Sequence, residues 1–367
     1  MRSIEVDPNL AVEPWPTGLA EVELARGIAD RLPEAGLRRV ALIRADSLQG
    51  LADPTGSTRV FLALENLQTT GSFKIRGALC ALDAARRSGV RAVVAASAGN
   101  HGIGVARAAR LFGMMATIVV PRGASETKVA RIRADGAEIL CTDGGYDAAE
   151  GSARKLAADR GVPFVSPYDD TLVLTGNGSS LAFEIVEALG RVPEHVIVPI
   201  GGGGLATGMA WGLAVCAGED PRKARRVWTV QSEASAAFAA SLEVGSAVEA
   251  LESNGQTLAD GLEGGISKAS FARTASVVAG VTVLAERRIA AAMAFVYGRW
   301  GLRLEGSAAA ALVPAIDGLT PLIRGGDLVI VLTGRNVDDA VFHGVTGEVA
   351  SFARMVAETG SSVHRTA

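Results

Sequence analysis

Four short segments of this sequence combine glycine with a polar or ionisable side chain where an apolar run gives way to a helical pattern. They are TTGSFKIRGA at 69–78, SAGNHGIG at 97–104, the glycines at 201–204, and LTGRNVD at 332–338. In α/β proteins, ligands bind where strands end and helices begin. The residue types in these segments could bind an anion through backbone N–H groups and transfer a proton through an amine.

The glycine run at 201–204 follows the apolar stretch HVIVPI and precedes LATGMAWGLAV. Four residues without Cβ leave the backbone open, and the N–H groups at the start of the next helix can converge on a phosphate. A tight turn alone would need only one or two glycines. The run therefore predicts a phosphate site.

Lys74 is the candidate for acid–base or covalent chemistry. Gly71 and Ser72 are typical of a turn and a helix cap, which would place Lys74 in the first turn of a helix. A cation there opposes the helix dipole, and the flanking Phe73 and Ile75 could exclude water and lower the pKa of the amine. Taken alone, however, the segment favours an ordinary solvated lysine.

Asn100, His101 and Thr333 are the other candidates. Asn100 and His101 are expected at a helix start, facing the crevice at the strand ends beside free N–H donors. Thr333 ends a strongly apolar run, where its hydroxyl could meet a ligand. Each also has a structural explanation, as a helix cap, a surface imidazole or the close of a strand.

The elements that must position these segments alternate between apolar β-rich runs and alanine-rich helical patterns. Strands are expected at 60–65, 92–97, 116–121, 138–142, 195–200, 226–231 and 327–333. Helices are expected at 102–112, 125–134, 147–160, 179–189, 204–217 and 286–299. This alternation predicts βαβ units and an α/β fold with two buried, mainly parallel sheets.

The same pattern predicts two domains. Residues 89–165 hold three strand–helix repeats and are expected to form a smaller inserted α/β domain, while 1–88 and 166–343 form the larger one. Residues 344–367 are expected to form a C-terminal helix and tail.

Composition limits the partners. The 367 residues are 49% hydrophobic and carry a formal net charge of −3 without a basic tract, which argues against nucleic acid or an anionic membrane as partner. Three scattered cysteines form no disulfide framework, and neither a signal peptide nor a long apolar span is evident. We therefore expect a soluble, cytoplasmic protein that acts on a small molecule.

Several catalytic motifs are missing from the sequence. It contains no GxxxxGK[ST], HExxH or GxSxG. Gly201, Gly203 and Ala206 do satisfy the G-x-G-x-x-A pattern of nicotinamide dinucleotide sites, but the next apolar run ends in Gln231 rather than in an acid that would bind ribose. A nicotinamide-dependent oxidoreductase therefore remains an alternative.

In their order and spacing, these segments resemble pyridoxal-phosphate enzymes of the tryptophan synthase β-like group (fold type II), and within it the threonine/serine dehydratases. The resemblance rests on SFKIRGA around Lys74, SAGNHG at 97–102, GGGGL at 201–205, LEGSAAAAL at 304–312 and LTGRNVD, and it covers roughly residues 35–340. It implies two domains, each a mainly parallel twisted sheet flanked by helices.

The resemblance implies a role for each matching residue. Lys74 would bind the aldehyde of pyridoxal 5′-phosphate covalently and act as the catalytic base, and Phe73 would lie against the pyridine ring. Asn100 would donate to the 3′-oxygen of the ring, and Thr333 would bond to the pyridine nitrogen. The phosphate would be held by Gly201, Gly202, Gly203, Gly204 and Leu205. The substrate carboxylate would be bound by Ser97, Ala98, Gly99, Asn100 and His101.

The activity implied is that of an ammonia-lyase (dehydratase), which converts a β-hydroxy-α-amino acid such as L-threonine or L-serine to a 2-oxo acid and ammonia. The same chemistry on 3-hydroxyaspartate or on a bulkier 3-hydroxy amino acid is an alternative. Racemisation and β-replacement are less favoured, because Ala98 carries no proton and His101 stands where cysteine-synthase-like enzymes usually have Thr. A cofactor-binding regulatory protein without turnover is a further alternative. A homodimer is also implied.

The sequence departs from the family pattern in four places. Arg335 stands at a glycine-like position, where it is expected to add a charge near the site. Residues 176–179 read GNGS instead of GQGT, and 305–309 read EGSAA instead of EPAGA. Gln231 replaces a Glu that binds a divalent cation in some relatives, and a neutral amide is a poor ligand for such a cation, so no metal site is expected there.

Overall fold

The computed structural model describes residues 1–7, 10, 19–31, 36–251, 257–318, 323 and 325–347. The strands are β1 (Arg2–Glu5), β2 (Leu42–Arg44), β3 (Thr58–Ala63), β4 (Ala92–Ala96), β5 (Met115–Pro121), β6 (Glu138–Thr142), β7 (His195–Pro199), β8 (Val227–Ser232), β9 (Val278–Leu284) and β10 (Gly326–Val331).

The longer helices are α4 (Lys74–Arg87), α5 (Asn100–Leu111), α6 (Glu126–Ala134), α7 (Tyr146–Arg160), α9 (Ser180–Leu189), α10 (Gly204–Ala217), α12 (Ala237–Val244), α13 (Lys268–Val277), α14 (Glu286–Trp300) and α17 (Asp339–Thr346). Shorter helices are α1 (Leu19–Ala25), α2 (Ile28–Arg31), α3 (Asp46–Ala52), α8 (Thr171–Leu174), α11 (Pro221–Ala224), α15 (Gly306–Ala309) and α16 (Val313–Ile316). Single turns are η2 (Glu65–Leu67), η3 (Thr175–Ser179, π-helical), η4 (Asp260–Leu262) and η5 (Ala310–Leu312).

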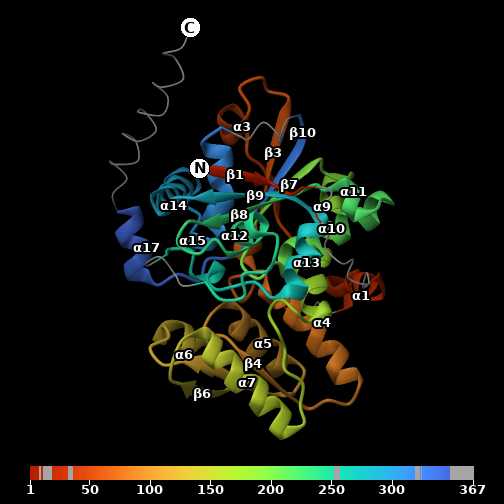
Figure 1. Cartoon of the computed structure of the whole chain (residues 1–367), viewed down its shortest axis with the longest axis vertical. Coiled ribbons are helices and arrows are strands. Elements are labelled where there is room, and N and C mark those ends of the chain that lie inside the picture. Colours follow the sequence, from red (N-terminus) through yellow and green to blue (C-terminus); the bar gives the residue numbers. More distant parts are fainter. Residues whose placement is uncertain are drawn as a thin grey trace.

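The larger sheet has seven strands in the order β1-β9-β8-β7-β10-β3-β2. The strands from β9 to β3 are parallel to their neighbours, and β1 and β2 add antiparallel edges. Along β10, Val329 and Val331 pack into one core with α9, α10 and α13, while Leu328 and Ile330 pack on the opposite face with α14, α15 and α16. Both faces of this sheet are therefore buried, as a parallel sheet requires (Figure 1).

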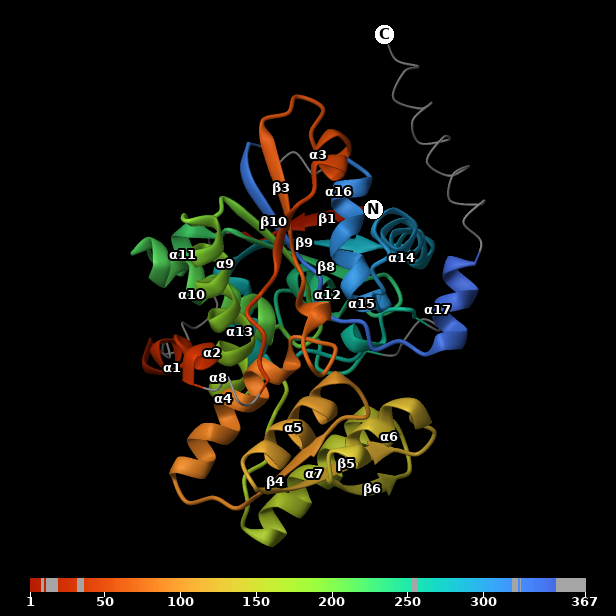
Figure 2. The ribbon, with the colours of Figure 1, turned by 180° about the vertical axis from the view of Figure 1, so that it is seen from behind.

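The smaller sheet has three parallel strands in the order β4-β5-β6. All three come from residues 92–142, and α5, α6 and α7 lie around them (Figure 2). Helix α4 packs against α5, so it joins this part of the chain to the larger sheet. The structure thus confirms the α/β class with two mainly parallel sheets, whereas the domain boundaries at 89–165 stay a prediction.

The seven expected strands and six expected helices are present, with ends that shift by at most two residues. Three strands were missed: β1, β2 and the buried β9. The run VAGVTVL of β9 follows α13 without a break, so no turn residue marks its start. Of the expected C-terminal helix and tail, residues 348–367 lie outside the described residues, and α17 ends at Thr346.

Across the part of the chain that the structure describes, no helix combines the length and the apolarity needed to cross a membrane.

Candidate active site

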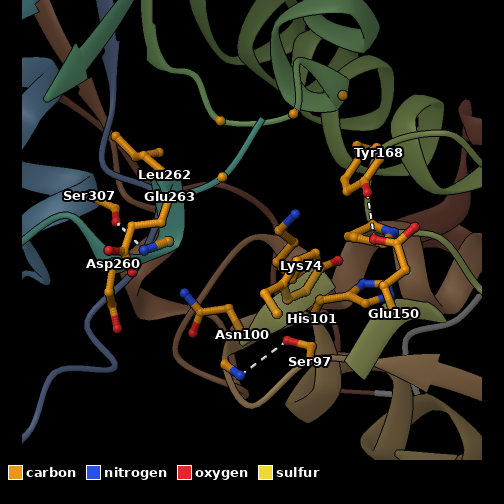
Figure 3. Close-up of a pocket in the computed structure, with 18 of the residues that line it drawn as sticks. Lys74, Ser97, Asn100, His101, Glu150, Tyr168, Asp260, Leu262, Glu263 and Ser307 are labelled. Carbon is orange, nitrogen blue, oxygen red and sulfur yellow. Dashed lines mark hydrogen bonds between the residues drawn. The ribbon is translucent and has the colours of Figure 1, made fainter. Parts of the chain in front are cut away.

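All the residues expected to carry chemistry line one cavity of about 750 Å³. It opens where α4, α5 and α10 begin, beside η4 and the turn that follows β10 (Figure 3). Its wall includes every predicted site residue: Phe73, Lys74, Ser97, Ala98, Gly99, Asn100, His101, Gly201, Gly202, Gly203, Gly204, Leu205 and Thr333. Segments up to 260 positions apart in sequence therefore meet at one place, as expected for residues that lie where strands end and helices begin.

The position of Lys74 is fixed by the backbone of the segment that leads into α4. It is the first residue of α4, and the N–H of Phe73 just before it donates to the Thr333 carbonyl at 3.0 Å. Gly71 makes the preceding turn with φ +79°. The expected cap at Ser72 is wrong, because Phe73 takes that position and makes no side-chain cap bond. The chain thus enters α4 through a backbone bond to the segment after β10.

Lys74 is half-buried in the wall of the cavity, and its Nζ lies 5.2 Å from the centre of the Phe73 ring. Burial lowers its pKa to about 8, because the charged form loses hydration, and the nearby Glu305 carboxylate offsets part of this effect. The expectation of a desolvated amine is therefore supported over that of a solvated lysine. Such an amine is partly neutral near pH 8, so it can act as a nucleophile or a base.

The glycine loop at 201–204, called the glycine cradle below, packs so closely on its neighbours that side chains would not fit there. A Cβ on Gly203, whose φ is +84°, would lie 2.3 Å from Thr274 Oγ1, and a Cβ on Gly202 would lie 2.7 Å from the Tyr168 ring. Helix α10 begins at Gly204, and the first N–H groups of a helix have no acceptor within it. The start of α10, with its free N–H groups and the positive end of the helix dipole, therefore lies in the cavity wall, where it would favour an anion.

At the start of α5, the His101 side chain and the Ser97 side chain just before the helix both hold the loop in place. His101 Nε2 lies 2.9 Å from the Val165 carbonyl and donates to it, because a carbonyl only accepts. Burial lowers the pKa of His101 to about 3, which favours the neutral ring. Its imidazole therefore anchors the loop, while the backbone N–H groups at the helix start face the cavity. Ser97 Oγ accepts from the Gly99 N–H at 3.1 Å, which shapes the turn before the helix.

Glu305 is a site residue that the sequence analysis quoted in a motif but did not assign a role. Its carboxylate is 3% exposed and accepts from Asn100 Nδ2 at 2.8 and 3.0 Å. Burial, together with the charge of Asp260, raises its pKa to about 7, against the opposing effect of the bond from Asn100. The Glu305 carboxyl thus lies in the wall of the cavity, bonded to Asn100.

Several other lining residues gave no signal of their own in the sequence. Lys128 on α6 forms an ion pair with Asp260 in η4, and the Tyr168 hydroxyl donates to Glu150 at 2.5 Å (Figure 3). Burial raises the pKa of Tyr168, so its phenol keeps its proton. These pairs join residues more than 15 positions apart, which is why spacing along the chain could not reveal them.

The departures from the family pattern fall mostly outside the cavity. The Arg335 guanidinium donates to the Asn66 carbonyl and is not part of the cavity lining, so the charge that it adds lies behind the wall of the site. Gln231 is buried, and its Oε1 accepts from the Ala239 N–H at 3.1 Å. In η3, Gly178 packs so closely on α10 that a Cβ would meet Met209 N at 2.3 Å, so this segment serves helix packing.

Comparison with known proteins gives one consistent result. The family model described as "Pyridoxal-phosphate dependent enzyme" matches residues 36–334. An L-threonine ammonia-lyase of Thermotoga maritima is 37% identical over 294 residues, which cover 78% of this chain and 69% of that protein. Two solved structures are similar: the processed form of threonine deaminase isoform 2 from Solanum lycopersicum (26% identity, TM-score 0.77, covering 95% and 98% of the two chains) and L-serine ammonia-lyase of Rhizomucor miehei (26%, 0.71, 86% and 99%).

The residues present fit pyridoxal phosphate. This cofactor offers a phosphate, an aldehyde and a pyridine nitrogen. The cavity provides a cradle without Cβ atoms at the start of α10, an amine of lowered pKa on Lys74, and the Thr333 hydroxyl. The family match and this fit agree, and they leave no support for the nicotinamide alternative. The chain belongs to the family of pyridoxal-phosphate-dependent enzymes.

Proposed function

We propose that this enzyme is an ammonia-lyase that converts L-threonine or L-serine to a 2-oxo acid and ammonia. The observation that carries the proposal is that the Lys74 amine, with its lowered pKa, lines the same cavity as the glycine cradle. The curated relative that is 37% identical is named an L-threonine ammonia-lyase, and a similar solved structure is an L-serine ammonia-lyase. Both names describe loss of ammonia from an amino acid.

When bound, pyridoxal phosphate supplies an aldehyde that joins amines and a ring that draws electrons away from the α-carbon. Lys74 would hold that aldehyde until the substrate amine displaces it, and would then accept the α-proton at Nζ. A pKa near 8 suits both tasks, because far more of the amine is neutral near neutral pH than at the ordinary pKa of 10.5. Phe73 would support the ring, and Asn100 would donate to its 3′-oxygen.

The other roles follow from the elements that end at the cavity. Gly201–Leu205 would hold the phosphate, and the segment Ser97–His101 would hold the substrate carboxylate at the start of α5, where backbone N–H groups and the helix dipole favour an anion. Thr333 would bond to the pyridine nitrogen. Its hydroxyl is neutral, so the ring gains less charge than an Asp partner would stabilise, which favours elimination over transamination. Ala98 offers no proton for racemisation.

The charge of the cavity bears on the choice of substrate. Besides Lys74, its cations are Lys128 and Arg154, whereas its carboxylates are Asp147, Glu150, Asp169, Glu249, Asp260, Glu263 and Glu305. The cofactor phosphate would add further negative charge. A second carboxylate on the substrate would be repelled here. L-threonine and L-serine, whose side chains are neutral, are therefore favoured over 3-hydroxyaspartate.

An assay of purified holoenzyme tests this proposal directly. We expect ammonia and an equal amount of 2-oxo acid from L-threonine and L-serine, and at least ~10-fold lower kcat/KM with L-threo-3-hydroxyaspartate, because one repelled charge costs about 1–2 kcal/mol. Chiral chromatography of the remaining substrate would measure racemisation in the same samples. Change of stereochemistry without ammonia release would overturn the proposal in favour of a racemase.

The lowered pKa of Lys74 predicts how attachment of the cofactor depends on pH. At pH 7 about a tenth of an amine with a pKa of about 8 is neutral, against fewer than ~1 in 1,000 at the ordinary pKa of 10.5. The rate of covalent attachment of pyridoxal phosphate to apoprotein, trapped with borohydride, should therefore rise with pH and level off above pH 8. The free lysine analogue Nα-acetyl-lysine is the control. A midpoint for the protein that matches this control would show that the amine is solvated.

The homodimer that the family resemblance implies and a cytoplasmic location stay predictions. Light scattering of the purified protein checks the first, and fractionation of cells that express it checks the second.

A further inference from the structure

Asn336 lies behind the cavity wall, and every polar atom of its side chain is hydrogen-bonded. It is 7% exposed, and its backbone N–H donates to Glu305 Oε2 at 3.0 Å. Its Nδ2 donates to the Thr70 carbonyl at 2.9 Å and to Asn100 Oδ1 at 2.6 Å, and its Oδ1 accepts from the Arg131 guanidinium. The two hydrogens of one amide thus serve two acceptors, and nothing in the side chain is left unpaired.

The partners of Asn336 permit one orientation of its amide. A guanidinium has no acceptor, and a backbone carbonyl has no donor. Asn336 Oδ1 must therefore face Arg131, and Nδ2 must face the Thr70 carbonyl and Asn100. Gly71 makes room for this amide, because a Cβ at that position would lie 2.3 Å from Asn336 Oδ1.

The fixed amide of Asn336 in turn orients the amide of Asn100. Because Asn336 presents a donor, Asn100 must present Oδ1 to it, and its Nδ2 then faces Glu305 at 2.8 and 3.0 Å. The two carboxylate oxygens can share one hydrogen of Nδ2, which leaves the second hydrogen for a ligand in the cavity. With the amide reversed, Asn100 would turn an oxygen to Glu305 and its NH₂ group to that of Asn336.

The Glu305 carboxyl group by itself would not fix the orientation of the Asn100 amide. A protonated carboxyl group can donate as well as accept, so near neutral pH it would tolerate either orientation of the Asn100 amide. The bond from Asn336 does not change with pH, because neither an amide nor a guanidinium titrates in this range.

We propose that Asn336 is a positioning residue that acts through Asn100: its Nδ2 keeps the NH₂ group of Asn100 turned toward the cavity, where the ring oxygen of pyridoxal phosphate needs a donor. The proposal rests on the proposed role of Asn100, and it does not depend on which amino acid the enzyme consumes. Thr70, Arg131 and Gly71 then serve to fix one amide.

Asn336→Asp tests this, because it keeps the shape and replaces the donor by an acceptor. Arg131 would still pair with the new carboxylate, so the fold should be retained, whereas Asn100 would have to turn its NH₂ group toward residue 336. We expect apoprotein affinity for pyridoxal phosphate, measured by absorbance titration, to fall about 10-fold, which corresponds to one hydrogen bond to a charged group. The matched control is Asp338→Asn, which makes the reverse exchange two residues along, outside the cavity lining.

A double-mutant cycle separates positioning from a general structural effect. Combined with Asn100→Ala, Asn336→Asp should cost less than ~2-fold in cofactor affinity, because the group through which it acts is gone. Thermal unfolding of each apoprotein checks that the fold is intact. An equal loss in both backgrounds would overturn the positioning role, and so would an unchanged affinity in the single variant. Failure of the parent protein to bind pyridoxal phosphate would instead refute the proposed function.

Discussion

Replacing Lys74 with alanine is expected to abolish turnover and leave the fold intact. The residue would be both the attachment point of the cofactor and the base that accepts the α-proton, and a positioned general base alone contributes ~10²–10⁴-fold. We expect kcat to fall at least ~10³-fold. The glycine cradle is untouched, so the variant should still bind pyridoxal phosphate, without covalent attachment. Ammonia release and borohydride trapping, measured on the same sample, check both parts.

The stability of the Lys74→Ala apoprotein should not fall near neutral pH. The folded-state pKa of Lys74, about 8, lies below its ordinary value of 10.5, so the unfolded chain binds the proton more tightly. The charged amine therefore opposes folding fully below pH 8, and this penalty fades as the pH rises toward 10.5. Removing the amine should raise the free energy of unfolding at pH 7, and the gain should shrink at pH 10.

The control for Lys74 is Lys155→Ala, which removes an exposed lysine paired with Asp159 on the surface of α7. It should retain the activity of the parent enzyme. Near-normal ammonia release by a folded Lys74→Ala protein would contradict the assignment of the catalytic lysine. A Lys74→Ala variant that fails to fold would contradict the stability argument instead, because that argument predicts that loss of the amine does not destabilise the fold.

Gly203→Ala is expected to have the next largest effect, because it would introduce both backbone strain and a steric clash. Gly203 has φ +84°, a conformation that costs an L-residue roughly 1–2 kcal/mol, and its Cβ would lie 2.3 Å from Thr274 Oγ1. Either the loop or α13 must move, and the N–H groups that face the cavity move with the loop. We expect affinity for pyridoxal phosphate, measured by titration of apoprotein, to fall roughly 5- to 30-fold, as a cost of about 1–2 kcal/mol implies.

Two further variants serve as a control for Gly203→Ala and separate the effect of the clash from that of the positive φ. Gly145→Ala precedes α7 at negative φ with open space around its Cβ position, so it should bind the cofactor as the parent does. Adding Thr274→Ala to Gly203→Ala removes the closest clash and leaves the positive φ, so recovery of affinity measures the share due to the clash. Unchanged affinity in Gly203→Ala alone would show that this loop does not hold the phosphate.

The sequence was enough to predict the α/β class and the segments of the site, because both depend on local patterns. A glycine run between an apolar strand and a helix exposes backbone N–H donors in any fold. A lysine at a helix start is unfavourable for the helix dipole, whichever elements pack around it. The order of five segments then indicated the family. Strand β9 was missed because it joins α13 without a turn, and there the local pattern carries no boundary.

Tertiary structure decided which way side chains point. Arg335 and Asn336 are adjacent in sequence, yet Arg335 turns to the Asn66 carbonyl while Asn336 bonds to Asn100 and Glu305. The partners lie between 31 and 269 positions away, so no local spacing could place them. Burial is set the same way: the pKa values of Lys74 and Glu305 shift because distant segments exclude water from both groups. The sequence by itself determined which chemical groups this enzyme has, and only packing determined which of them meet and in what state of charge.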